Sequence, residues 1–234
     1  MISSAPKRAI WAVLPAKRLA QAKTRLAGCL SLAERQMLAR VMLEDVLAAL
    51  EQCPHLGGIL LVTADPDLRD IGARAGADIL DDDDRDGQTS SVAAAAATLA
   101  EREEAGLLAI SGDIPLVTPA EIAEVIIHTQ SERSITLVPA PADMGTNILA
   151  LRPLGAIDFR FGVRSFFEHR KRALEQAIMP TILHLRGAGL DLDRPQDLLA
   201  FMKTPSNTRT YSFLTGLGLI ERLGGSGHES RKIL

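Results

Sequence analysis

The chain has 234 residues, of which 47% are hydrophobic and 24% charged, an ordinary balance for a globular protein with a full core. No apolar run approaches the roughly 20 residues of a membrane span, and the apolar run near the N-terminus stops before Lys17, too short for a signal peptide; we therefore expect a cytoplasmic protein with no membrane partner. The net charge of −3 argues against a nucleic-acid partner, and two cysteines without CxxC spacing give neither a zinc site nor a disulfide framework.

Strand-like apolar runs alternate with helical patterns through most of the chain. The predicted strands cover residues 9–14, 58–63, 77–80, 107–111, 134–139, 146–151 and 181–185. The predicted helices cover residues 31–52, 65–75, 90–104, 164–177 and 195–202, and another begins at Thr118. Two capping boxes, Ser31 with Glu34 and Thr118 with Glu121, mark helix starts. The alternation predicts a single three-layer α/β/α domain with a mostly parallel, mixed sheet covered on both faces.

The C-terminal part of the chain differs in composition. Residues 204–234 are richer in Ser, Thr, Gly and Asn, and their apolar periodicity fades. We therefore expect one domain over residues 1–203, followed by a C-terminal arm, partly disordered, over residues 204–234.

The loop after the first predicted strand gathers positive charge. Leu14 and Pro15 are followed by Lys17, Lys23 and Arg25. Ligands of open α/β sheets bind beyond the carboxyl ends of the strands, and clustered cations there suit a polyphosphate. A solvated basic loop explains the same charge run. The motifs GxGxxG and GxxxxGK[ST] are absent from the sequence, which argues against a dinucleotide-binding fold or a P-loop enzyme.

Carboxylates follow two other predicted elements. Asp113 comes directly after the apolar run 107–111, where a carboxylate can face a cleft and bind Mg²⁺; an aspartate bonded to its own turn is the alternative. In GLDLDRP, Asp191 and Asp193 stand two residues apart, so on an extended segment they point the same way. Asp193 can also cap the helix that begins near Pro195, but this leaves Asp191 unexplained.

Small residues near a strand start and a helix start form a further group. They are Thr146, Gly162 and Ser165. Backbone N–H groups at a helix N-terminus can bind an anion without any lysine. An ordinary serine N-cap accounts for Ser165 equally well.

Five segments in this order resemble a known family: VLPAKRLAQAKTRL, SGDIPLVTPAEI, GTNILALRP, FGVRSFFEH and DLDRPQDL. They resemble the phospholactate/phosphoenolpyruvate guanylyltransferases of deazaflavin coenzyme F-420 biosynthesis, nucleotidyltransferases with a glycosyltransferase-A-like fold. The resemblance covers residues 9–203. It implies three groups of site residues: Lys17, Lys23 and Arg25 for the nucleotide phosphates, Asp113, Asp191 and Asp193 for Mg²⁺, and Thr146, Gly162 and Ser165 for a phosphorylated acid.

The resemblance also implies a reaction. GMP would pass from GTP to the phosphate of phosphoenolpyruvate, 2-phospho-L-lactate or 3-phospho-D-glycerate, with release of diphosphate. The second pKa of a phosphate ester is about 6, so the acceptor is already anionic and needs no side-chain base. We accordingly expect His169 to be structural or to face the acceptor. A homodimer is compatible with the sequence.

One segment departs from the family pattern. DGQTSSVAAAA, with Gly87, Ser90 and Ser91 as expected nucleotide-binding residues, looks more like the molybdopterin cytidylyltransferases. We favour GTP, because residues 145–147 and 161–169 match the guanylyltransferases. A molybdopterin cytidylyltransferase-like enzyme and a non-catalytic nucleotide-binding module are the alternatives. The acidic run 81–84 is expected to face solvent, although one member can touch the ribose or a metal.

Overall fold

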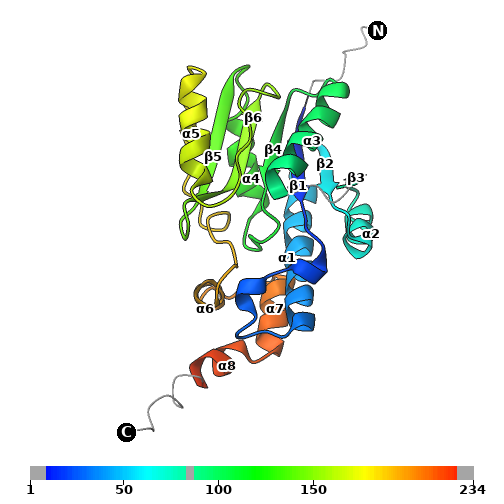
Figure 1. The fold of residues 1–234 in the computed structure, drawn as a ribbon, viewed down its shortest axis with the longest axis vertical. Helices are drawn as coiled ribbons and strands as arrows, with labels where there is room; N and C mark the ends of the chain where they lie inside the picture. The colour runs from blue at the N-terminus through cyan, green and yellow to red at the C-terminus, as the bar shows by residue number, and fades with distance from the viewer. Residues whose placement is uncertain (1–8, 83–86, 226–234) are drawn as a thin grey trace.

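The computed structural model describes residues 9–82 and 87–225. They form one seven-stranded sheet in the order β3-β2-β1-β4-β6-β5-β7 (Figure 1). Strand β6 runs antiparallel to β4 and β5, and all other neighbours in the sheet are parallel. The predicted α/β class with a mostly parallel, mixed sheet is thereby confirmed.

The strands are β1 (Ile10–Pro15), β2 (Leu56–Val62), β3 (Asp78–Leu80), β4 (Gly106–Ile110), β5 (Ser134–Ala140), β6 (Gly145–Arg152) and β7 (Thr181–Ile182). The helices are α1 (Leu32–Glu51), α2 (Pro66–Arg74), α3 (Gly87–Glu101), α4 (Pro119–Ile127), α5 (Ser165–Glu175), α6 (Pro195–Met202), α7 (Arg209–Gly216) and α8 (Leu219–Gly225). Two short 3-10 helices, η1 (Leu19–Gln21) and η2 (Thr24–Leu26), lie between β1 and α1.

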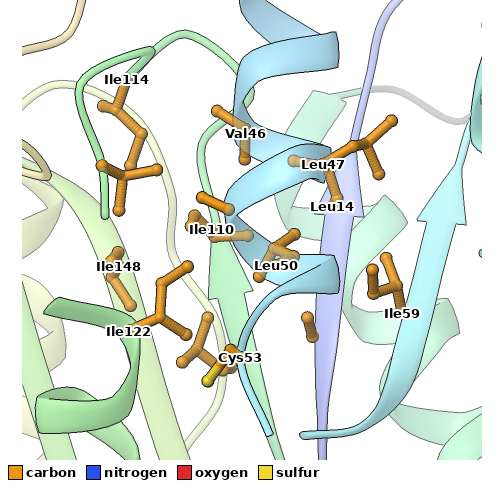
Figure 2. Packing of buried hydrophobic residues seen from close by; sticks show 14 of the residues in the cluster. Leu14, Val46, Leu47, Leu50, Cys53, Ile59, Ile110, Ile114, Ile122 and Ile148 are labelled. Atoms are coloured by element: carbon orange, nitrogen blue, oxygen red, sulfur yellow. The ribbon is translucent and has the colours of Figure 1, made fainter. Parts of the chain in front are cut away.

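The core has a layer on each face of the sheet. On β1, the side chains of Ala12 and Leu14 join one layer and that of Val13 joins the other, as the two-residue period of a strand requires. Helices α1, α2 and α4 cover the first face, and α3 and α5 cover the second. Figure 2 shows Leu47 of α1 beside Leu14, above the sheet.

Local sequence signals set most helix starts. Both predicted capping boxes are confirmed: the Ser31 hydroxyl accepts from Glu34 N, and the Thr118 hydroxyl accepts from Glu121 N. Asp65 caps α2 by accepting from the N–H groups of Asp67 and Leu68. These caps satisfy amides that would otherwise lack a partner in the first helical turn.

The C-terminal segment contains two helices that the composition of residues 204–234 did not indicate. Helix α7 lies against α1 at the end of the molecule away from β5 (Figure 1). Thr208 is the N-cap of α7 and its hydroxyl accepts from Tyr211 N. The Asp45 carboxylate of α1 accepts from Arg209 N, Thr210 N and the Thr210 hydroxyl, so a residue distant in sequence also holds the start of α7. The boundary at residue 203 stays a prediction, and residues 226–234 lie outside the described part of the chain.

Most predicted elements match the structure within two residues at each end, but two differ by three residues. Helix α3 begins at Gly87 rather than at Ser90. Strand β7 has two residues rather than five, because the chain turns from the sheet toward α4, where Gly187 N donates to the Glu121 carboxylate at 2.7 Å. None of the described helices combines the length and the apolar character needed to cross a bilayer.

The topology selects one place on the sheet for a ligand. The chain builds β1, β2 and β3 outward in one direction, and β4 then pairs with the other side of β1. At such a switch point the connections after two neighbouring strands diverge and leave a crevice beyond their carboxyl ends. The connections after β1 and β4 contain the predicted basic loop and Asp113.

Candidate active site

A cavity of about 890 Å³ opens at this switch point. Its lining includes Pro15, Lys17, Lys23, Arg25, Gly87, Ser91, Asp113 and Asp193, which are eight of the predicted site residues. It also includes Arg18, Asp82, Gln88, Ser111 and Gly112, which the sequence analysis did not select as site residues. The basic loop, the start of α3 and the loop after β4 therefore border one space.

The basic loop is fixed to the sheet at several points. Ala16 N continues the pairing of β1 by donating to Val62 O at 2.9 Å. The Asp65 carboxylate, while capping α2, also accepts from Leu19 N at 2.8 Å. Lys23 has a left-handed backbone with φ of 51°, directly before η2. These contacts fix the backbone around Lys23.

Four side chains form what we call the charged cluster: Lys23, Arg25, Asp113 and Asp193. The Lys23 Nζ lies 2.6 Å from Asp113 Oδ2 and 2.7 Å from Asp193 Oδ1. The Arg25 Nη1 lies 3.1 Å from Asp193 Oδ2. The Lys23 side chain is 9% exposed, whereas those of Asp113, Asp193 and Arg25 are 27%, 35% and 53% exposed. The ammonium group is thus enclosed by carboxylates that still reach the cavity.

The contacts of Asp193 correct one interpretation. We expected this carboxylate to cap the helix at Pro195, but Asp197 Oδ2 accepts from both Asp193 N and Arg194 N. Because Asp197 satisfies these amides, the Asp193 carboxylate is available to Lys23 and Arg25. The segment is joined to the loop after β4 by the hydrogen bond from Leu192 N to Asp113 O, at 3.0 Å.

The titration of the cluster follows from its charge balance. Burial alone would lower the pKa of Lys23, but attraction and hydrogen bonds from Asp113 and Asp193 raise it above its ordinary value. Burial would raise the pKa of Asp193, but Lys23 and then Arg25 lower it below its usual range. Both groups therefore keep their charges at neutral pH.

Among the described residues, Asp191 forms no salt bridge with a cation. Burial, and then the charge of Asp113, raise its pKa to about 6, although its own backbone N–H and Asn147 oppose the shift. The Asn147 Nδ2 lies 3.4 Å from Asp191 Oδ1 and 3.0 Å from Ala188 O. Asp191 is therefore a partly buried carboxylate with the negative charge of Asp113 nearby.

The carboxylates have the donor chemistry that Mg²⁺ prefers. Within residues 9–82 and 87–225, no three His, Cys, Asp or Glu side chains converge as a closed metal site. Protein sites for Mg²⁺ commonly use only one or two carboxylates, together with water and substrate phosphates. Asp113 and Asp191, two carboxylates close enough to repel each other, fit such an open site.

The start of α3 borders the cavity with some of its predicted residues. Gly87, with φ of 87°, and Ser91 line it. The Ser91 hydroxyl donates to Asp82 Oδ1 at 2.9 Å, which brings one member of the acidic run to the cavity. Asp81 is paired with Arg69 instead, and residues 83–84 are not among the described residues.

Two predicted nucleotide-binding side chains do not line the cavity. The Ser90 hydroxyl donates to Gly87 O at 2.9 Å. The Leu14 side chain is fully buried in the core. Leu14 therefore helps to position the basic loop, but its side chain is not available to a nucleotide.

The predicted acceptor residues lie on the α5 side of the sheet, outside the cavity lining. Thr146 is the second residue of β6, and Ser165 begins α5. The Ser165 hydroxyl donates to Thr146 Oγ1 at 3.0 Å, and the His169 Nδ1 lies 3.0 Å from the same oxygen. We call Thr146, Ser165 and His169 the neutral cluster; all three are buried.

The start of α5 differs from both sequence interpretations. Arg164, not Ser165, is the N-cap, and no side chain caps it. The N–H groups of Ser165, Phe166 and Phe167 already donate to the carbonyls of Gly162, Met144 and Arg164. The first-turn amides are thus occupied, so an anion here would be bound by side chains and by the loop around Gly162.

Gly162 leaves room for a ligand beside the neutral cluster. Its φ of 125° is a conformation that favours glycine, and a Cβ built on it would meet no atom within 4 Å. The neighbouring Phe161 N donates to Thr89 Oγ1 at 2.9 Å, which connects this loop to the start of α3. Thr89 stands next to Gln88 of the cavity lining, so the two sites share one helix start.

Two side chains with clear contacts, Asn147 and Thr89, were not selected from the sequence, and His169 was expected only to be structural or to face the acceptor. Asn147 positions Asp191, Thr89 holds the loop at Phe161, and His169 contacts Thr146. Asn147 and His169 lie inside the segments that carry the family resemblance, which was a usable signal. Thr89 lies in the departing segment and gave none.

Comparisons with known proteins agree on a family. The model of the family described as "Guanylyl transferase CofC like" matches residues 10–232. A phosphoenolpyruvate guanylyltransferase of Conexibacter woesei is 33% identical over 85% of this chain and 90% of its own length. A 2-phospho-L-lactate guanylyltransferase of Methanothermobacter thermautotrophicus is 31% identical over 88% and 90%. A 3-phospho-D-glycerate guanylyltransferase of Colwellia psychrerythraea is 32% identical over 82% and 92%.

Solved structures agree on the fold. A protein of Desulfovibrio desulfuricans G20, described as a candidate nucleotide-diphospho-sugar transferase, matches with a TM-score of 0.74 over 91% of this chain and 96% of its own. Its sequence is 16% identical, so the match concerns the fold alone.

Proposed function

The chain belongs to the CofC-like guanylyl transferase family, and from this premise we propose that it transfers GMP from GTP to the phosphate of a small phosphorylated three-carbon acid. The relatives named above act, by their names, on phosphoenolpyruvate, 2-phospho-L-lactate or 3-phospho-D-glycerate. Because all three relatives are named guanylyltransferases, they favour guanine over cytosine despite the departing segment at residues 86–91. A role in deazaflavin coenzyme biosynthesis stays a prediction.

The observation that supports this function most directly is the charged cluster at the switch point. A triphosphate brings several negative charges, and Lys17, Lys23 and Arg25 border the same cavity as Asp113 and Asp193. A triphosphate can compete with the carboxylates for Lys23 and Arg25, since phosphate oxygens accept the same charge-assisted hydrogen bonds. The cavity volume of about 890 Å³ falls within the range of nucleotide-sized sites.

The reaction then needs positioning and charge stabilisation. An oxygen of the acceptor phosphate attacks the α-phosphorus of GTP, a new P–O bond forms, and the bond to the bridging oxygen breaks as diphosphate leaves. The amino groups of Lys17 and Lys23 and the Arg25 guanidinium would stabilise the charge that develops on the leaving diphosphate. No protein base is required, because the acceptor oxygen is already ionised near neutral pH.

We assign Mg²⁺ to Asp113 and Asp191, with Asp193 at the edge of the site. When bound, the ion would neutralise phosphate charge and hold the α-phosphate in a fixed orientation. The negative charge of Asp113 close to the partly buried Asp191 carboxylate supports this assignment.

Turnover of the full chain tests the proposal. The protein is incubated with GTP or CTP, Mg²⁺ and each of the three acids, and both diphosphate release and product mass are measured. We expect a guanosine diphosphate conjugate of at least one acid, and no product after chelation with EDTA. A cytidine product would contradict the guanylyl assignment, and turnover undiminished by EDTA would contradict the metal assignment.

A further inference from the structure

The neutral cluster contains a histidine whose two ring nitrogens have different partners. His169 is fully buried on α5, and its ring lies edge-on to Phe161 with centroids 4.9 Å apart. Its Nε2 accepts from Arg160 N at 3.0 Å, and its Nδ1 lies 3.0 Å from Thr146 Oγ1. The ring therefore connects the loop before α5 to the start of β6.

The contact with Arg160 determines the tautomer of the ring. A backbone N–H can only donate, so Nε2 must present its lone pair, and the proton of the neutral imidazole must be on Nδ1. Burial, and then the charge of Arg172, lower the pKa of His169 to about 4, which keeps the ring neutral at physiological pH. The Nδ1–H group consequently donates to Thr146 Oγ1.

This tautomer decides what Thr146 can offer to a ligand. A hydroxyl oxygen has two acceptor positions and one donor hydrogen. The two acceptor positions are filled by the Nδ1–H of His169 and by the hydroxyl of Ser165. The described part of the chain contains no acceptor bonded to the Thr146 hydrogen, so this hydrogen remains for an acceptor outside the protein.

We propose that His169 is a positioning residue that makes the Thr146 hydroxyl a hydrogen-bond donor to an anionic oxygen of the phosphorylated acid. This inference rests on the proposed function. It means that the Thr146 hydroxyl donates to the acceptor acid and does not accept from it. The same ring holds the backbone next to Gly162, where open space lies beside the cluster. The loop after β4 is directly adjacent, since Ser111 N, beside the cavity, donates to the carbonyl of Asn147 at 2.9 Å.

Two amide substitutions separate the two contacts of the ring. The side-chain NH₂ of His169→Asn can replace Nδ1 as the donor to Thr146, but it cannot reach Arg160. The carbonyl of His169→Gln can replace Nε2 as the acceptor for Arg160 N, but it leaves Thr146 without its donor. Both variants lose the ring contact with Phe161, so each is the packing control of the other.

Steady-state kinetics with GTP and the acid that the wild-type enzyme uses distinguish the two variants. We expect His169→Gln to raise the KM for the acid about tenfold, the usual weight of a hydrogen bond to a charged group, while His169→Asn stays within about threefold of the wild type. The KM for GTP should be unchanged in both. Thr146→Val should raise the KM for the acid as much as His169→Gln does. The double variant Thr146→Val/His169→Gln should have a KM for the acid no higher than either single variant.

If His169→Asn and His169→Gln changed the KM for the acid equally, the proposal would be overturned. Additive increases of this KM in the double variant would overturn it as well. The ¹⁵N spectrum of the free protein with labelled histidine gives a second test that needs no turnover. A neutral ring protonated at Nδ1 supports the proposal, and a ring protonated at Nε2 overturns it. The proposed function is tested by turnover of the wild-type protein, whereas the role of His169 is tested by the variants and the spectrum. Failure of one can therefore be told from failure of the other.

Discussion

The charged cluster and the neutral cluster lie at the same edge of the sheet, but they satisfy their polar groups in opposite ways. In the charged cluster, Lys23 is bonded to carboxylates 90 and 170 residues away, and the carboxylates remain partly exposed. In the neutral cluster, Thr146, Ser165 and His169 are almost fully buried and carry no charge at neutral pH. The carboxylates of the first cluster are accessible to ions and water, whereas the second cluster is almost fully covered by the protein and borders open space only at the loop around Gly162.

This difference indicates how each cluster can respond to a ligand. The ion pairs of the charged cluster can be exchanged for phosphate, metal or water, because each partner is itself charged and reaches the cavity. The hydrogen bonds of the neutral cluster are buried, where an unpaired polar group costs about 1–3 kcal/mol. The first cluster is suited to rearrange on binding, whereas the second is suited to be preorganised.

The largest effect should follow from removing a carboxylate of the charged cluster. Asp113→Asn should lower diphosphate release by about 1,000-fold or more, because it removes charge from both the proposed metal site and Lys23. Melting temperature and circular dichroism should show an intact fold. Asp67→Asn, on the exposed start of α2, is the matched control and should behave like the wild type. Near-normal turnover in Asp113→Asn would refute the role of Asp113.

The second largest effect should follow from removing the charge of the buried Lys23. Lys23→Met keeps the length of the side chain and removes the charge, so Asp113 loses its ion pair with Lys23 while Asp193 keeps the one with Arg25. We expect turnover to fall about 100-fold and stability to fall by about 1–3 kcal/mol, less than for a fully buried pair because water reaches both carboxylates. Urea unfolding measures the stability change. Lys171→Met, on the exposed side of α5, is the control, and equal stability of the two variants would contradict this account.

The neutral cluster should instead appear in the pH dependence of stability. The pKa of His169 is about 4 in the folded protein and 6.5 in the unfolded chain, so the unfolded state binds more protons between these values. The contribution is fully present above pH 6.5 and is lost as the pH falls toward 4, by about 2–3 kcal/mol at pH 4.5. Urea unfolding at pH 7 and 4.5 should show this loss in the wild type and in the exposed control His184→Gln, but a smaller one in His169→Gln.

The sequence predicted the features that depend on neighbouring residues, but not the contacts between distant segments. The strands and both capping boxes depend on neighbouring residues, and their patterns were readable. The charged residues of the site were found because they follow strands, which is a rule of topology. Their pairing was not readable, because the bonds of Lys23 join segments 90 and 170 residues apart.

Two errors have the same cause. Asp193 and Asp197 both stand near the start of α6, and the structure gives the amides to Asp197. Helix α7 has a local cap in Thr208, whose hydroxyl accepts from Tyr211 N, but the Asp45 carboxylate, 164 residues before Arg209, also accepts from its first amides, and no pattern along the chain indicated that contact. For His169, the resemblance pointed to the right segment, but the tautomer depends on Arg160 and Thr146 in three dimensions.

The smallest effect should come from Arg25, the most exposed member of the charged cluster. Its side chain is 53% exposed and forms an ion pair with Asp193, at 3.1 Å. Exposed ion pairs contribute roughly 0–1 kcal/mol, so Arg25→Gln should change stability by less than about 0.5 kcal/mol. Its guanidinium can still bind a phosphate, and we expect the KM for GTP to rise about two- to fivefold, with a difference from the wild type that shrinks at high salt. Arg40→Gln removes a comparably exposed ion pair on α1 and should leave the KM for GTP unchanged. A loss of kcat as large as that of Lys23→Met would mean that exposure does not separate the roles of the two cations.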